Sequence, residues 1–388
     1  MIIPITKPFF DEEELKAAQL PLESGWVVQG KFVKEFEDKF SAFTGARFSI
    51  ATTSCSTAMH VAVTALDLKP GDEVIVPAFT WVSTANVVEY MHAKPIFCDI
   101  DLRTFNIDTS RIEQLITPQT VGIIPVHLFG LCADMGPILE IAKKHKLWVL
   151  EDAACGFGAS YHGRHAGTFG EMGCFSFHPR KSITTGEGGM ITTALPEFDR
   201  LSRIFRDHGA SRTDFDREFM KSSFLLADFN HLGYNYRLTD IQGALGCAQM
   251  KKAEWILAER SRRARVYDET LANVEWVETP VVADGYVHGY QAYVCLFRPE
   301  EPILGNVAHM NRKRNELMAR LETKGIATRQ GTHAPVIQGY YAEKYGLRPE
   351  QFPNAYLADR LSLTIPLYVQ MTEAEQALVV SELQKTYS

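Results

Sequence analysis

Between about residues 44 and 195, the chain alternates short β-branched apolar runs with longer segments of helical periodicity. This alternation is typical of a parallel sheet whose strands are joined by helices packed on its two faces. Several runs are apolar on both faces, as strands buried inside such a sheet must be. We therefore predict an α/β doubly wound domain, with strands at 72–77, 94–101, 121–130, 147–154, 173–178 and 188–193.

Helix candidates lie between these strands. They carry small or apolar residues three and four positions apart, and most of them open near Ser, Thr or Asp, which favour helix N-caps. The sequence predicts helices at 56–68, 83–93, 109–116 and 135–146.

The alternation of apolar runs and helical segments stops after about residue 240, where a long amphipathic stretch at 241–271 begins. It leads into two expected strands and two expected helices, of which one ends at Gly325 and the other begins at Thr372. We predict a large domain over 1–245 and a smaller α+β domain over 246–388. The strands are expected at 289–297 and 324–330, the helices at 311–325 and 372–387, and a long loop over a site or interface at 208–229.

The net charge and the number and spacing of the cysteines indicate which partners and which cellular compartment to expect. The formal net charge is −7 with no basic block, which argues against nucleic acid or an anionic membrane as partners. The seven cysteines are scattered without a C-x-x-C pair, so we interpret them as reduced thiols of a cytoplasmic protein. The N-terminus turns acidic at Asp11, and no apolar run is long enough for a signal peptide or a membrane span.

Polar residues just after predicted strands are the first candidates for a site, because ligands of open α/β sheets bind at the carboxyl ends of the strands. Asp152 follows the apolar run at 147–151, although it or Glu151 could simply cap the next turn. Lys181 lies just past a strand and before a glycine-rich return, although a lone lysine is usually a solvated surface charge.

The segment 51–60 opens a predicted helix with hydroxyls and small residues. Helix N-termini present free backbone N–H groups, so Ser54, Ser56 and Thr57 could cradle a phosphate, or could form an ordinary helix cap. The chain has neither a G-x-x-x-x-G-K-[ST] loop nor a G-x-G-x-x-G fingerprint. The sequence therefore contains no motif that predicts binding of a nucleoside triphosphate or a dinucleotide.

A phosphate cradle, an Asp and a Lys on strand ends of one sheet together meet the needs of pyridoxal phosphate (PLP). Its phosphate needs an anchor, its aldehyde needs a lysine, and its pyridine nitrogen needs a carboxylate. Phe79 and Trp81 follow another predicted strand, where an aromatic face could stack on the ring or belong to the core.

The chain resembles the DegT/DnrJ/StrS sugar aminotransferases, fold-type I PLP enzymes that mostly act on nucleotide-linked keto sugars. The similarity runs nearly from end to end, and its most specific segments surround the lysine and the motif GYNYR. The matching segments are 24–46, 69–86, 123–135, 150–159, 175–190, 233–246 and 361–375.

The resemblance assigns roles by matching position. It implies that Lys181 forms the Schiff base with the cofactor, that Asp152 pairs with the pyridine nitrogen, and that Trp81 stacks on the ring. Phosphate contacts correspond to Cys55, Ser56 and Ser176 of one subunit and to Asn235 of its neighbour, which implies a homodimer with shared active sites. Arg237 would clamp a substrate carboxylate or diphosphate, and Thr332 and His333 fall where relatives approach the sugar, although a turn is an equally good reading of that segment. No metal is expected.

Two positions depart from the family pattern. Ser54-Cys55-Ser56 replaces the common Ser-Gly-Thr, which spares a backbone cradle but leaves the side-chain contact of Ser56 open. Cys155 replaces a Gln or His that contacts the cofactor ring, and a thiol is a weaker hydrogen-bonding group.

The resemblance implies transfer of an amino group from glutamate to a keto sugar, for polysaccharide or secondary-metabolite synthesis. The string ITTGEGGM favours members that aminate C4 of a 4-keto-6-deoxy sugar nucleotide, such as perosamine synthases, over those that act at C3. The alternatives are a non-catalytic or regulatory PLP-binding protein of the same fold, and an aminotransferase for a non-nucleotide keto substrate. A PLP-dependent sugar dehydratase is disfavoured because it carries histidine where this chain has Lys181.

Overall fold

A seven-stranded, mostly parallel sheet forms the centre of the structure, a computed structural model that describes residues 2–211 and 227–385. The strand order is β1-β9-β8-β5-β4-β2-β3, and only β9 runs antiparallel to its two neighbours. The strands are β1 (Phe48–Thr52), β2 (Glu73–Pro77), β3 (Lys94–Cys98), β4 (Thr120–Ile123), β5 (Trp148–Asp152), β8 (Met172–Ser176) and β9 (Gly189–Thr193).

All six strands predicted for this sheet are present, so the predicted α/β doubly wound class is confirmed. The predicted run at 121–130 is too long, because β4 ends at Ile123 and only Val126 still pairs with Asp152. The strand β1 was not predicted; it is short, precedes α3 and pairs antiparallel with β9.

Successive side chains along a strand point to opposite faces of the sheet and pack against the helices on each face. In β2, Val74 and Val76 join the core beneath helices α3 and α4, whereas Ile75 joins the core beneath α5. These helices are part of the larger α/β region, whose helices are α1 (Glu12–Ser24), α2 (Lys31–Thr44), α3 (Cys55–Ala65), α4 (Ser83–Tyr90), α5 (Met135–His145), α6 (Pro196–Arg206) and α8 (Asp240–Lys251).

The helix predicted at 109–116 is wrong as a single α-helix. The segment forms two successive 3₁₀ turns, Thr109–Arg111 and Glu113–Leu115. Asp108 accepts a hydrogen bond from the backbone of Ser110 only two residues on, and Pro118 follows soon after, so the segment is too short to continue as an α-helix.

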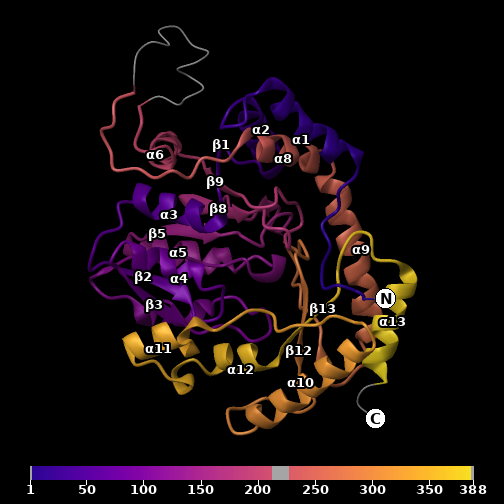
Figure 1. The fold of residues 1–388 in the computed structure, drawn as a ribbon. Coiled ribbons are helices and arrows are strands. Elements are labelled where there is room, and N and C mark those ends of the chain that lie inside the picture. The colour runs from indigo at the N-terminus through magenta and orange to yellow at the C-terminus, as the bar shows by residue number, and fades with distance from the viewer. Residues whose placement is uncertain (1, 212–226, 386–388) are drawn as a thin grey trace.

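A smaller antiparallel sheet of order β10-β12-β13 lies beside the large one, with α10, α11 and α12 along the lower edge of the molecule in Figure 1. Helix α13 packs on α9, as Figure 1 shows at the right. The elements are β10 (Val277–Glu278), β12 (Tyr293–Phe297), β13 (Ser362–Ile365), α9 (Ala253–Leu271), α10 (Val307–Thr323), α11 (Gly339–Tyr345), α12 (Pro353–Leu361) and α13 (Glu373–Gln384). A third small sheet joins β11 (Tyr286–Val287), β6 (Ser160–Tyr161) and β7 (Arg164–His165).

The strand expected at 324–330 is wrong, because this segment pairs with two different partners, each through a single bridge. Ile326 bridges Ile3 near the N-terminus, and Arg329 bridges Thr364 of β13. The predicted domain boundary at 245/246 falls inside α8, and the division stays a prediction. Most of the loop predicted at 208–229 lies outside the described residues.

Candidate functional site

Asp152 and Ser176 end two neighbouring parallel strands, so their side chains leave the sheet at the same edge. Asp152 is the last residue of β5 and lies opposite Cys174 in β8. Lys181 follows β8 after a tight turn in which its backbone N–H donates to the carbonyl of His178. The sheet therefore brings Asp152 and Lys181 to one end.

The Asp152 carboxylate is buried and held by two donors. The Thr84 hydroxyl donates to Oδ2 at 2.7 Å, and the backbone N–H of Ala154 donates to Oδ1 at 3.1 Å. Burial raises the pKa of Asp152 above its ordinary value, although these hydrogen bonds and the charge of Lys181 act to lower it.

The Lys181 amine donates to the thiol sulfur of Cys155 at 3.1 Å. Burial acts to lower the pKa of Lys181, but the charge of Cys155, its hydrogen bond and the charges of Cys55 and Asp152 outweigh burial, so the pKa is raised. Cys155, the residue that departs from the family pattern, therefore contacts the reactive amine directly.

The N-terminus of α3 lies at the same edge of the sheet. Ser54 and Thr57 form a capping box in which each hydroxyl accepts from the other residue's backbone N–H. These two hydroxyls are therefore occupied, and the half-buried Ser56 and the backbone of Cys55 are left for a phosphate. Gly189 permits this approach, because a Cβ there would lie 2.7 Å from the Cys55 nitrogen.

Trp81 and His333 come from distant segments and meet beside the site. The Thr80 backbone N–H donates to the His333 carbonyl at 3.0 Å, and the Trp81 and His333 rings are 6.2 Å apart. The Trp81 side chain is 59% exposed, so its face is open to a planar ligand. The backbone before Thr332 packs closely against Phe129, because Gly331 has no side chain. A Cβ at Gly331 would lie 2.8 Å from the ring of Phe129.

Asn235 and Arg237 differ in exposure and in whether their side chains already have a partner within the chain. Asn235 is exposed, and its backbone bridges Asp207. Arg237 bridges Thr52 at the end of β1, and its guanidinium forms an ion pair with Asp207. The charge of Arg237, predicted to clamp a substrate anion, is thus already paired within the chain.

The sequence analysis missed Thr84 and His127. Thr84 stands three residues after Trp81 at the start of α4, where a hydroxyl at a helix N-terminus was the available signal. His127 was hidden by the overlong strand prediction. Its Nδ1 accepts from the backbone of Ala133 at 3.1 Å, so Nε2 carries the proton and donates to the buried Glu151 at 2.8 Å.

Glu151 has a structural role beside Asp152. Its carboxylate also accepts backbone hydrogen bonds from Gly167, Phe169 and Gly170. Glu151 thereby fixes the loop before β8, while Asp152 points to the site. Asp152 itself also caps the next turn, because its Oδ1 accepts from the backbone N–H of Ala154, whereas Glu151 binds the more distant loop at 167–170.

The residues at this edge fit pyridoxal phosphate. A buried carboxylate, a buried amine, an exposed indole face and a helix N-terminus with a spare hydroxyl are the groups its ring nitrogen, aldehyde, ring and phosphate require. The Ser182 hydroxyl next to the lysine is buried without a hydrogen-bond partner, which indicates polar capacity not used by the protein itself. Within the described residues, no group of acidic, His and Cys side chains has the arrangement of a metal site.

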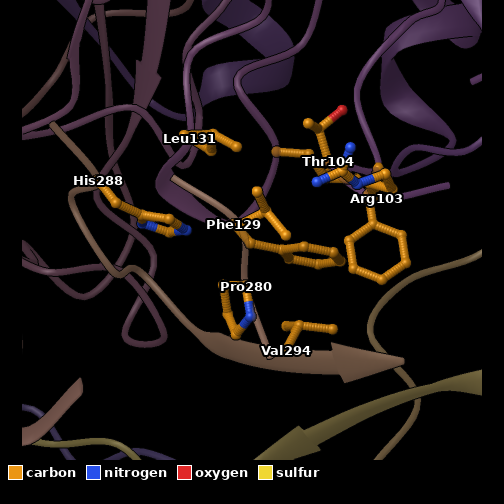
Figure 2. Close-up of a pocket in the computed structure, with 10 residues that line it drawn as sticks. Arg103, Thr104, Phe129, Leu131, Pro280, His288 and Val294 are labelled. Atoms are coloured by element: carbon orange, nitrogen blue, oxygen red, sulfur yellow. The ribbon is translucent and has the colours of Figure 1, made fainter. Parts of the chain in front are cut away.

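A separate small pocket lies between the loop that follows β3, the loop that follows β4 and the segment before β12 (Figure 2). It is lined by none of the predicted site residues. Its lining includes Arg103, Thr104, Phe129, Leu131, Pro280, His288 and Val294.

The model of the DegT/DnrJ/EryC1/StrS aminotransferase family matches residues 8–384. The chain belongs to this family. The predicted fold class, the aminotransferase activity and the dependence on pyridoxal phosphate are confirmed by this membership, and the family uses an amino donor and a keto sugar.

Two curated members of the family and one solved structure illustrate the similarity. The chain is 36% identical over 385 residues to the GDP-perosamine synthase of Caulobacter vibrioides, covering 99% of this chain and 98% of that protein. It is 34% identical to the spore coat polysaccharide biosynthesis protein SpsC of Bacillus subtilis, covering 96% and 93%. The PMP-form of Spr1654 from Streptococcus pneumoniae superposes with a TM-score of 0.91 at 25% identity, covering 99% and 98%.

No helix in the described part of the chain is long and apolar enough to cross a membrane.

Proposed function

We propose that this aminotransferase transfers the amino group of glutamate to a nucleotide-linked 4-keto-6-deoxy sugar, with Lys181 as the catalytic residue. The observation that supports it most is that the buried Asp152 carboxylate and the part-buried Lys181 amine lie at one edge of the sheet, where the charge of each acts on the pKa of the other. The cofactor, when bound, serves as an electron sink that stabilises negative charge at the donor's α-carbon.

Lys181 has two tasks in this proposal. Its amine would hold the cofactor, and the freed amine would then take up the proton released from the donor's α-carbon. Asp152 keeps the ring nitrogen protonated, and Thr84 orients the carboxylate. Trp81 covers one face of the ring and excludes water, and Ser56, Ser176 and the Cys55 backbone bind the phosphate.

The acceptor is proposed from sequence similarity. The GDP-perosamine synthase relative makes an amino sugar attached to GDP, and its similarity extends over nearly the whole of both chains. Thr332 and His333 lie beside Trp81, where a sugar would approach the cofactor. A panel of keto-sugar nucleotides incubated with glutamate and analysed by mass spectrometry tests this step. Amination of none of them, with amination of a free keto substrate, would contradict it.

We propose further that the enzyme acts as a cytoplasmic homodimer with shared active sites. Asn235 is exposed in the single chain, as a residue that completes a neighbour's phosphate site would be. The remaining alternative is a PLP-binding protein without turnover. It predicts that the cofactor's visible absorption persists with every amino donor, whereas the enzyme's absorption shifts when L-glutamate is added.

The decisive variant is Lys181→Ala. It should retain the fold and lose turnover, because no other buried amine is available among the residues around Asp152 that the structure describes. Circular dichroism checks the fold, and mass spectrometry after borohydride reduction checks covalent uptake of the cofactor. Full activity in this variant would refute the proposal.

A further inference from the structure

Cys155 differs from the other cysteines of the chain in both exposure and contacts. The structure describes all seven cysteines, and Cys155 is half-buried whereas the other six are buried. Its thiol sulfur accepts a hydrogen bond from the Lys181 amine at 3.1 Å. Cysteines that react with peroxides are typically open to solvent and lie beside a cation. Peroxide should therefore oxidise Cys155 before any of the other thiols.

The backbone holds the thiol and the amine together. Cys155 lies in a tight turn shortly after β5, closed by a hydrogen bond of 2.8 Å from the Gly156 N–H to the Ala153 carbonyl. Lys181 closes the turn that follows β8, where its N–H donates to the His178 carbonyl at 2.8 Å. Strands β5 and β8 are paired neighbours in the sheet. The fold itself therefore sets the contact between the sulfur and the nitrogen.

The chemistry of these two groups permits a covalent link. Hydrogen peroxide takes two electrons from a thiol and converts it to a sulfenic acid, with release of water. A nearby nitrogen nucleophile then attacks the sulfur, an S–N bond forms, and the sulfenic hydroxyl leaves as water with a proton from the amine. In sum, one thiol, one amine and one hydrogen peroxide give one sulfenamide and two waters.

Oxidation of Cys155 would also prepare the amine for this reaction. Burial acts to lower the pKa of Lys181, and the charge and hydrogen bond of Cys155 are the largest influences that raise it. A sulfenic acid at this position does not carry the charge of a thiolate, so the pKa of Lys181 falls on oxidation. More of the neutral, nucleophilic amine is then present.

We propose that Cys155 is a site of peroxide oxidation and that its sulfur then joins the Lys181 nitrogen in a reversible sulfenamide cross-link. A dithiol reverses the link, because one of its sulfurs displaces the amine from Cys155 and the other releases the Cys155 thiol as the reductant becomes a disulfide. The link occupies the amine that the cofactor needs, so the modified protein takes up no pyridoxal phosphate. The cross-link rests on the contact described above, and its effect on cofactor uptake rests on the proposed role of Lys181.

Peptide mapping tests the cross-link. Trypsin gives a fragment 147–164, which carries Cys155, and a fragment 181–200, which begins with Lys181 when that lysine is blocked. After hydrogen peroxide treatment of the full-length protein freed of cofactor, we expect the two fragments as one species, lighter by two hydrogen atoms than their sum. Dithiothreitol should separate them. A disulfide between Cys155 and Cys55, or a sulfinic acid at Cys155 beside an unmodified Lys181, would overturn the inference.

Two variants remove one partner each. In K181A the sulfenic acid has no amine beside it, so peroxide should carry Cys155 on to the sulfinic acid, which dithiothreitol does not reduce. In C155S no cross-link should form, and peroxide should leave PLP uptake as it was before treatment. C132A lacks a buried thiol and is the control, which should behave as the wild type.

Visible absorbance after addition of PLP measures cofactor uptake. Peroxide should abolish uptake by the wild type, and dithiothreitol should restore it. If the oxidised wild type contains no cross-link and takes up PLP normally, the inference alone fails. If the cross-link forms and PLP uptake persists, Lys181 is not the amine that holds the cofactor, and the proposed function fails while the modification site stands.

Discussion

At the scale of single residues, the site is a cluster of ionisable side chains that change one another's pKa. Thr84 and Ala154 hold the Asp152 carboxylate, and Cys155 receives the hydrogen bond of the Lys181 amine. Because the thiol sulfur of Cys155 accepts from the Lys181 amine at 3.1 Å, Cys155 takes part in setting the pKa of that amine.

Replacing Cys155 with Ala should lower the pKa of Lys181, since the charge and hydrogen bond of this thiol are what raise it most. Only the neutral amine reacts with an aldehyde, so the pH midpoint for PLP uptake by the apoprotein should move to lower pH in C155A. Stopped-flow absorbance over a series of pH values measures this midpoint. C98A, which removes a buried thiol from the edge strand β3, is the control and should leave it unchanged. A midpoint that moves upward in C155A would contradict the prediction.

At the scale of elements, one buried acid joins two helices to the edge of the large sheet. Glu37 of α2 accepts from Arg203 and Arg206 of α6 at 2.8 and 2.6 Å, and from the backbone of Ala51 in β1 at 2.9 Å. Arg206 in turn donates to the Ala51 carbonyl at 2.7 Å. This network fixes the strand that leads directly into α3 and its phosphate-binding N-terminus.

Glu37→Gln should destabilise the protein by about 3 kcal/mol or more, because it leaves the buried Arg206 without its counterion. Burial raises the pKa of Glu37, but the two arginines more than offset it, so the pKa is lowered overall. The ion pair therefore stabilises the protein above the ordinary carboxyl pKa of 4.5, and this contribution is lost as the pH falls through the lower, folded-state pKa.

Urea denaturation at pH 7 and at pH 4 measures both effects. The wild type should lose stability between these values more steeply than E37Q. E35Q, on the exposed side of the same helix, breaks only a surface pair with Lys39 and should cost less than about 1 kcal/mol. Equal losses in E35Q and E37Q would show that the buried network has no special role.

At the scale of the whole molecule, the site is assembled from parts of the chain that are far apart in sequence. Asp152 and Lys181 come from the strand ends of the large sheet, the segment at 329–333 comes from the region of the small sheet, and the exposed Asn235 would complete the neighbour's site in the proposed dimer. An active site divided in this way gives complementary defects in different subunits.

Mixed dimers test the shared site. K181A and N235A should each have little activity alone, and co-refolded mixtures should recover about one quarter of the wild-type activity, because half of the dimers then contain one intact site of two. Activity assays on mixtures, with size-exclusion chromatography to confirm the dimer, measure this. Activity no greater than the sum of the two variants would contradict subunit sharing.

The sequence by itself determined the six strands of the α/β pattern, the helices α3, α4, α5, α10 and α13, and the helix start at Thr372, and it placed Asp152 and Lys181 next to strand ends. These are local signals: periodicity, cap residues, and polar side chains directly after apolar runs. The family resemblance added Asn235 and Arg237 of the GYNYR segment, for which no local pattern indicated a role.

Only the tertiary structure decided which distant groups meet. The Thr84 hydroxyl reaches Asp152 across 68 positions of sequence, β1 pairs with β9, and Arg329 bridges Thr364 of β13. Strand order and loop path fix these contacts, and neither is encoded in the period of a single segment. The same reason explains why 324–330 reads as a strand but forms single bridges: its pattern shows that it is extended, whereas its neighbours decide whether it has a partner.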